Sequence, residues 1–367
     1  MNRIFLDNIN SSININESDI YRSCNELNSD FIDYFGRKSK AKIDEIRNYY
    51  SKILKTENNK IFFAKNSLSS FKSIINYSLL FLDIQQIITS EFENNNVLDY
   101  LKSVENARKI KLIFIETDNL GKISTADLEQ KISKNNNSLV FLLHANEYNG
   151  ILLPVKEVSQ ICIKNKSIFY LNLDLTICKY DIDFQTINPD FASFDFKNLS
   201  RNTNSGIIFY NQQINISNKK YIEIRNNFIA DENINPEILV KDVEIFNRAL
   251  RNMEKNKIYI VNLKKYLISK MKENFNIENT LSLYNNEGLY FMVSYFLPTS
   301  IFGKYILQKL DIEGITVGNA DYPNNNKIAD NEFIRIGINE FNTEKDINFF
   351  ISKLINLKNN FIEQQKN

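Results

Sequence analysis

The sequence predicts an α/β fold: a mainly parallel seven-stranded sheet with flanking helices, followed by a smaller C-terminal α+β domain. Short apolar runs alternate with helical periodicity between residues 60 and 211, and one long helical stretch replaces this pattern after about residue 240. Near-continuous apolar runs are typical of strands buried on both faces, and the segments between them suit crossover helices. With 367 residues, the chain can form a large domain over residues 1–240, including the N-terminal segment, and a small one over residues 241–367.

Seven apolar runs mark the predicted strands of the large domain. They are residues 61–65, 86–90, 111–117, 138–145, 167–174, 191–195 and 205–211. A helix before the first run is predicted from Ile43, Ile46, Tyr50, Ile53 and Leu54, which recur at the three-to-four spacing of an amphipathic face. The apolar side of this helix should pack on the sheet.

The C-terminal part has a different pattern. Its long helical stretch covers residues 237–271, and strand-like pieces follow around residues 280–297, 314–318 and 333–338. A last helix should begin at Thr343, because a threonine hydroxyl can cap the free N–H groups of a helix start. This order of elements predicts the small α+β domain.

Composition and charge exclude several classes of partner and site. Lys and Arg number 45 and Asp and Glu 44, so the net charge of +1 gives no basic field for nucleic acid or an anionic membrane. No apolar run reaches membrane-spanning length and the N-terminus has no secretory pattern, so we expect a cytoplasmic protein. The cysteines, Cys24, Cys162 and Cys178, are odd in number and form no C-x-x-C pair, which disfavours a disulfide framework and a zinc site. No metal is expected.

Several common catalytic motifs are missing. His144 is the only histidine, and no G-x-S-x-G, G-x-G-x-x-G or P-loop motif is present. A histidine at the end of a buried strand is more often a hydrogen-bonded core residue than a catalyst. In an open α/β sheet, ligands bind in the crevice at the carboxyl ends of the strands, so the functional residues should be sought there.

Polar side chains and one lysine follow the predicted strands. They are Asn66 and Ser67, Asn146, Asn172 and Asp174, and Lys197. Asn66 and Ser67 open a helix whose N–H groups could hold a phosphate, although an ordinary helix cap gives the same pattern. An anion cradle, a strand-borne acid or amide and a lysine together suggest a pyridoxal phosphate site, because that cofactor needs an anion cradle, a partner for its ring nitrogen and an imine lysine.

Six segments in order resemble the class V aminotransferases, and among them most closely the cysteine desulfurases. They are residues 3–8, 35–54, 87–101, 142–162, 190–210 and 333–354. The resemblance implies the type I pyridoxal-phosphate fold, pyridoxal 5'-phosphate as cofactor, a small amino-group substrate, and a homodimer with the active site at the subunit boundary. It also implies roles for single residues: Asn146 would contact the cofactor hydroxyl, Ser67 its phosphate, and Arg335 the substrate carboxylate.

Other positions depart from the family pattern. Asn94 replaces the histidine that stacks on the cofactor ring, and Asn172 falls where the family has the aspartate that partners the ring nitrogen. Asp174 could take that role after a small register shift. Asp195 stands near a phosphate-binding serine, where its negative charge would repel a phosphate. The cysteine loop of the desulfurases is replaced by residues 318–326, which contain no cysteine.

The role of Lys197 depends on the alignment of one turn. Without gaps, Asn198 falls on the Schiff-base position, whereas shortening the preceding turn by one residue places Lys197 there. The first hypothesis is therefore a pyridoxal-phosphate-dependent enzyme that acts on an amino acid or another amino-group substrate through a Lys197 Schiff base, and that is not a standard cysteine desulfurase. The alternative is a catalytically degenerate homologue that binds a ligand or partner without this cofactor, because function depends on the site and not on the fold.

Overall fold

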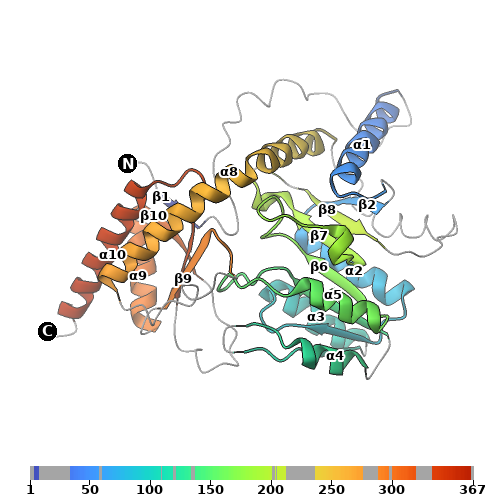
Figure 1. The fold of residues 1–367 in the computed structure, drawn as a ribbon, viewed down its shortest axis with the longest axis horizontal. Coiled ribbons are helices and arrows are strands. Elements are labelled where there is room, and N and C mark those ends of the chain that lie inside the picture. Colours follow the sequence, from blue (N-terminus) through green and yellow to red (C-terminus); the bar gives the residue numbers. More distant parts are fainter. Residues whose placement is uncertain are drawn as a thin grey trace.

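The computed structural model contains two sheets joined by one long helix (Figure 1). It describes residues 4–7, 34–57, 60–108, 110–118, 121–133, 137–200, 203, 205–211, 236–275, 288–296, 300–319 and 333–364. The predicted α/β architecture is confirmed. Most of the segment that replaces the desulfurase cysteine loop, residues 320–326, lies outside the described residues, as does Cys24.

The large sheet has seven strands in the order β2-β8-β7-β6-β5-β3-β4. Each corresponds to a predicted apolar run: β2 (Ile61–Ala64), β3 (Gln86–Thr89), β4 (Lys111–Phe114), β5 (Ser138–Leu143), β6 (Ile168–Asn172), β7 (Phe191–Asp195) and β8 (Gly206–Tyr210). Only β8 runs against its neighbours, since it pairs antiparallel with both β2 and β7 while the other pairings are parallel. The mainly parallel sheet is thus confirmed.

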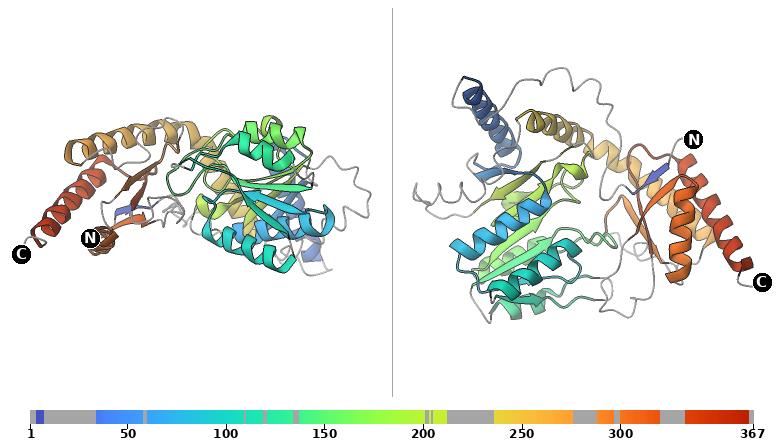
Figure 2. Two further views of the ribbon diagram at one scale, coloured as in Figure 1. Left: turned by 90° about the horizontal axis from the view of Figure 1, so that it is seen from below. Right: turned by 180° about the vertical axis from the view of Figure 1, so that it is seen from behind.

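The strands of this sheet are buried on both faces, as their apolar sequences require. Successive residues of β5 contribute to different cores: Leu139 and Phe141 to one, Val140 and Leu142 to the other. Helices α2 (Ser67–Phe81) and α3 (Asn95–Arg108) cover the first face. The second face is covered by α1 (Tyr34–Ile53), α4 (Thr125–Ser133), α5 (Val155–Lys164) and α6 (Phe184–Ile187) (Figure 2).

The small sheet has the order β1-β10-β11-β9. Its strands are β1 (Ile4–Leu6), β9 (Met292–Phe296), β10 (Ile315–Asn319) and β11 (Phe333–Gly337), with α9 (Ser300–Ile312) and α10 (Glu344–Gln364) packed beside them. Thr343 caps α10 as predicted, because its hydroxyl accepts a hydrogen bond from the Asp346 N–H. β1 pairs with β10, so the N-terminal strand lies with the small sheet although it falls within the range 1–240 that was assigned to the large domain.

Helix α8 (Pro236–Asn274) is 39 residues long and connects the two parts (Figure 1). Leu239 and Phe246, near its start, belong to the core of the large sheet. Leu263 and Leu267, near its end, belong to the core of the small sheet. The expected division between residues 240 and 241 therefore falls inside a continuous helix. Among the described helices, none is both long and apolar enough to cross a membrane.

Candidate ligand site at the strand ends

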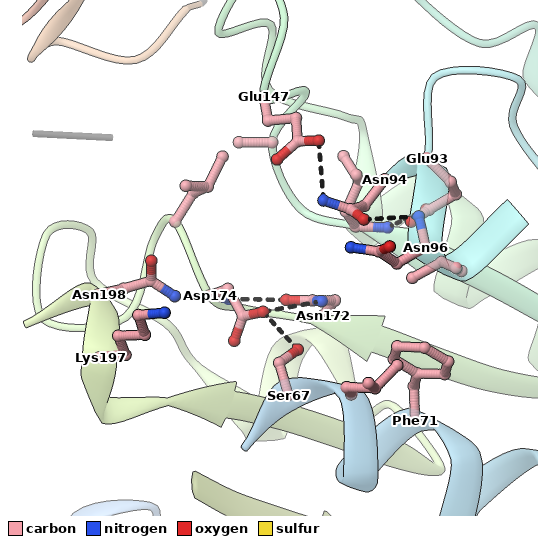
Figure 3. A pocket seen from close by; sticks show the side chains of 15 residues that line it. Ser67, Phe71, Glu93, Asn94, Asn96, Glu147, Asn172, Asp174, Lys197 and Asn198 are labelled. Carbon is pink, nitrogen blue, oxygen red and sulfur yellow. Dashed lines mark hydrogen bonds between the residues drawn. The ribbon is translucent and has the colours of Figure 1, made fainter. Parts of the chain in front are cut away.

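A pocket of about 250 Å³ lies where the parallel strands end. Of the residues singled out in the sequence, it brings together Ser67, Asn94, Asn172, Asp174 and Lys197 (Figure 3). Its lining is completed by Leu68, Phe71, Glu93, Asn96, Val97, Leu143, Ala145, Glu147, Leu175 and Asn198. The carboxyl ends of the strands thus do meet at one crevice.

The start of α2 forms one wall of this pocket. Asn66 is the N-cap: its side-chain oxygen accepts from the Ser69 N–H at 2.8 Å, and the Asn66 N–H donates to Ser69 Oγ at 3.2 Å. This reciprocal pair is a capping box, which satisfies two backbone donors that the helix cannot satisfy itself. Asn66 therefore makes the ordinary helix cap that the sequence analysis kept as the alternative to a phosphate contact.

A carboxylate of the chain itself lies at the N-terminus of α2. Asp195, the last residue of β7, accepts a hydrogen bond from the Ser67 N–H through Oδ2 at 3.0 Å. Its Oδ1 accepts from the Lys197 N–H at 2.8 Å. The first free N–H group of the helix, which the sequence analysis considered for a phosphate, is thus bound to an internal anion, an arrangement that the helix dipole favours.

Asp174 lies beside Asp195 and is held by donors on both of its oxygens. Oδ1 accepts from the Asp195 N–H at 2.8 Å, and Oδ2 accepts from Ser67 Oγ at 2.6 Å and from Asn172 Nδ2 at 3.1 Å. Burial raises the pKa of Asp174 to about 6, against the lowering effect of these hydrogen bonds. The Ser67 hydroxyl is therefore also committed to a carboxylate.

Lys197 is an exposed residue on the short 3-10 helix Phe196–Asn198, which directly follows β7. Its side chain and that of Asn198 face Asp174 from one side of the pocket (Figure 3). Lys197 is the single amine among the residues that line the pocket. Its neighbour Asn198, which takes the Schiff-base position in the ungapped alignment, lines the same space.

Two acidic residues of the pocket were not predicted from the sequence. Glu93 is buried, its Oε1 accepts from the Leu143 N–H at 2.7 Å, and burial raises its pKa to about 8. Glu147 accepts from Asn94 Nδ2 at 3.0 Å, and burial raises its pKa while Arg335 lowers it. Glu93 follows β3 as Asp174 follows β6, so the rule of searching at strand ends, applied to every strand, could have found it.

Asn146 and Arg335 lie next to the pocket without being part of its lining. Asn146 Oδ1 accepts from the Tyr148 N–H at 2.8 Å, and its Nδ2 is buried without a partner among the described residues. Gly121, at φ +82°, is needed there because a Cβ would lie 2.8 Å from that nitrogen. Arg335 Nη1 donates to the Glu147 carbonyl at 2.9 Å, and Nη2 lies 3.7 Å from Asp7 Oδ1. Both residues support the loop that carries Glu147.

The donor set of this pocket does not fit the phosphate of pyridoxal phosphate. The Ser67 N–H and hydroxyl, which would hold the phosphate, donate to Asp195 and Asp174. A phosphate at the start of α2 would have to displace one carboxylate and remain beside the other, and like charges in a partly desolvated site repel strongly. Lys197 and Asp174, for which the sequence suggested an imine and a ring-nitrogen role, both line the pocket, and these roles stay predictions.

Comparisons with known proteins agree with the fold. Residues 16–197 match the family model of the class-V aminotransferases. The cysteine desulfurase IscS of Glaesserella parasuis serovar 5 is 26% identical over 167 residues, which are 45% of this chain and 41% of that protein. The cysteine desulfurase IscS of Buchnera aphidicola from Acyrthosiphon pisum (strain 5A) is 28% identical over 162 residues, 44% of this chain and 40% of that protein. The chain thus matches about two-fifths of the length of these curated relatives.

Solved structures extend the likeness in fold to nearly the whole chain. A NifS-like protein superposes with a TM-score of 0.82 at 19% identity, covering 97% of this chain and 99% of that structure. A NifS-like protein from Rickettsia africae superposes with a TM-score of 0.79 at 18% identity, again covering 97% and 99%. The expected type I fold is confirmed, and the chain is a class V aminotransferase-like protein related to the cysteine desulfurases, as its sequence predicted.

Proposed function

We propose that this chain is a catalytically degenerate class V aminotransferase-like protein, whose strand-end pocket binds a small uncharged or amine-bearing molecule in place of pyridoxal phosphate. One observation carries this proposal: the carboxylate of Asp195 is bound to the first free N–H of α2. In the anion site of a helix N-terminus, a covalently attached anion competes with any diffusing one at high effective concentration.

The charge of the pocket supports the same conclusion. Three carboxyl groups and four amides line it against one amine, that of Lys197. Because burial raises the pKa of Glu93 to about 8, this carboxyl is mostly protonated at pH 7 and can donate a hydrogen bond. Asp174, with Asp195 directly beside it, still leaves this wall of the pocket acidic, which favours amine and hydroxyl donors over a dianion.

The second candidate function is the pyridoxal-phosphate enzyme predicted from the sequence. It is favoured by the presence of Ser67, Asp174 and Lys197 on one pocket. Under this hypothesis Lys197 would carry the cofactor, and Asp195 would turn away from the helix when the phosphate binds. The homodimer that the family resemblance implies is also a proposal, which sedimentation at micromolar concentration tests.

Replacement of Asp195 by Ser separates the two functions. We expect the unmodified protein to bind neither inorganic phosphate, measured by calorimetry, nor pyridoxal phosphate, measured by visible absorption and borohydride trapping. Asp195→Ser frees the Ser67 N–H and removes the charge, so it should gain phosphate binding. Asp183→Ser is the matched control, because Asp183 also caps a helix, through the Gln185 N–H at 3.0 Å, but is no part of the pocket lining.

Two results would contradict the proposal. If the unmodified protein retains pyridoxal phosphate and Lys197→Met abolishes that retention, the enzyme hypothesis replaces it. If Asp195→Ser gains no phosphate binding while remaining folded, Asp195 is not the group that excludes the phosphate.

A further inference from the structure

A second pocket, of about 70 Å³, lies at the junction of the two parts of the molecule. Its lining comes from the segment after β6 (Cys178 and Lys179), the turn after β7 (Asn198 and Leu199), the middle of α8, and residues next to β9 and β11. We call it the junction pocket. Asn198 lines both this pocket and the strand-end pocket.

The junction pocket contains a buried amine without an acceptor. Lys179 is partly exposed along its side chain, but its Nζ is buried and has no hydrogen-bond partner within the described parts of the chain. The Lys179 Nζ instead makes a cation–π contact with the ring of Phe291, whose centroid lies 4.2 Å away. A ring face attracts a cation but does not replace the hydrogen bonds that the ammonium group makes in water, so this arrangement is costly as it stands.

Lys264 shows how the same molecule normally satisfies a buried amine. Its Nζ donates to the Leu289 carbonyl at 2.8 Å. Burial lowers the pKa of Lys264 to about 8, and it lowers the pKa of Lys179 to about 8 as well. Burial lowers the pKa of both lysines, but only Lys264 has a hydrogen-bond acceptor, and the amine without one among the described residues is the one at the junction pocket.

We propose that the junction pocket binds a small carboxylate, which accepts hydrogen bonds from the Lys179 ammonium and from the amide of Asn256. Asn256 lines the pocket, and its side chain has no hydrogen-bond partner among the residues that the structure describes. Charge-assisted hydrogen bonds of this kind are the strong ones in proteins. Since one water needs about 10 to 15 Å³ of such space, the pocket has room for an anion of a few heavy atoms.

The groups around Lys179 decide in favour of an anion. At pH 7 the amine is mostly protonated, because its pKa of about 8 lies above that pH, so it needs a negative partner more than a carbonyl carbon to attack. The ionisable groups that line the pocket with it are Cys178, Tyr290 and Glu340. The exposed Glu340 carboxylate raises the pKa of Lys179 but is not hydrogen-bonded to its Nζ. The ligand therefore enters beside Glu340 without having to displace it.

Acetate and propionate are suitable probes, with sodium chloride at the same concentration as the control for ionic strength. We expect acetate to raise the thermal unfolding temperature of the unmodified protein and to bind in calorimetry. Lys179→Met should weaken binding at least tenfold, and Asn256→Ala should weaken it less. Lys264→Met, a matched loss of a buried lysine, should leave the response to acetate unchanged.

Three results would overturn this inference. Equal acetate binding by the unmodified protein and Lys179→Met would place the anion elsewhere. Binding that appears only in Glu340→Gln would show that Glu340 already pairs with Lys179. The absence of acetate binding in the unmodified protein would mean that water satisfies the amine. The inference stands independently of the proposed function, because none of these measurements involves the start of α2.

Discussion

The two pockets differ in whether their buried charged groups have hydrogen-bond partners. Beside the strand-end pocket, Asp195 has a backbone donor on each carboxylate oxygen, and its neighbour Asp174, which lines the pocket, has donors on both oxygens too. In the junction pocket, Lys179 Nζ has no acceptor among the described residues. Beside the first pocket, the N-terminus of α2 is already bound to a carboxylate of the chain itself. A buried charged group that lacks a hydrogen-bond partner is therefore a better indicator of a ligand site than its position in the fold.

The largest expected effect is a change in the pH dependence of stability when Glu93 of the strand-end pocket is replaced. The pKa of Glu93 in the folded protein, about 8, lies above its ordinary value, so the stability linked to Glu93 is fully present below about pH 4.5 and is lost as pH rises through 8. Glu93→Gln keeps an acceptor for the Leu143 N–H and removes the ionisation. We expect it to be more stable than the unmodified protein by about 2 to 4 kcal/mol at pH 8.5, and nearly equal in stability at pH 4.5.

Urea unfolding at several pH values measures this difference. Glu105→Gln is the control, because Glu105 accepts from the Leu112 N–H at 2.9 Å in a comparable bond but is only partly buried. A Glu93→Gln protein with the same pH dependence as the unmodified one would show that Glu93 stays ionised in the pocket. The contrast between the two pockets would then be smaller than described.

A smaller effect on stability is expected at the N-terminus of α2, where the Asp195 carboxylate is bound. Asp195→Ala removes the acceptor of the Ser67 and Lys197 N–H groups, and the loss of such a cap costs about 1 to 2 kcal/mol. Asp195→Asn keeps one side-chain oxygen as an acceptor and should lose less. Equal stability of Asp195→Ala and the unmodified protein in urea would show that water replaces the carboxylate without cost.

The smallest effect compares the two buried lysines. In a buffer free of carboxylates, Lys179→Met removes a charge without an acceptor, so we expect it to gain up to about 1 kcal/mol of unfolding free energy. Lys264→Met leaves the Leu289 carbonyl without its donor and should lose about 1 kcal/mol. Urea unfolding of both variants gives the sign of each change, and a loss for both would mean that Lys179 has a partner of its own.

The sequence predicted the large sheet well because each strand carries its own signal. Residues such as Leu139, Val140, Phe141 and Leu142 alternate between two cores, and a strand buried on both faces must be apolar throughout. Local chemistry also predicted the Thr343 cap. The place of β1 could not be predicted in this way, because its partner β10 lies more than 300 residues away in the chain.

The site was predicted less completely, and the reason is again the range of the interactions. The repulsion between Asp195 and a phosphate follows from the sequence, but the hydrogen bond from the Ser67 N–H to Asp195 does not, because it joins residues 128 apart. Lys179 was not singled out, since a lysine is usually exposed. Its burial against Phe291 depends on a segment from the other sheet.

Helix α8 has a mechanical consequence. At 1.5 Å per residue, its 39 residues form a rod about 58 Å long that is anchored in both cores and is not interrupted by proline after its first residue. An unbroken rod transmits torque, so a rotation of the small sheet about the helix axis also turns Met253 and Asn256, the side chains that α8 presents to the junction pocket. A rotation of the small sheet would therefore change the shape of the junction pocket.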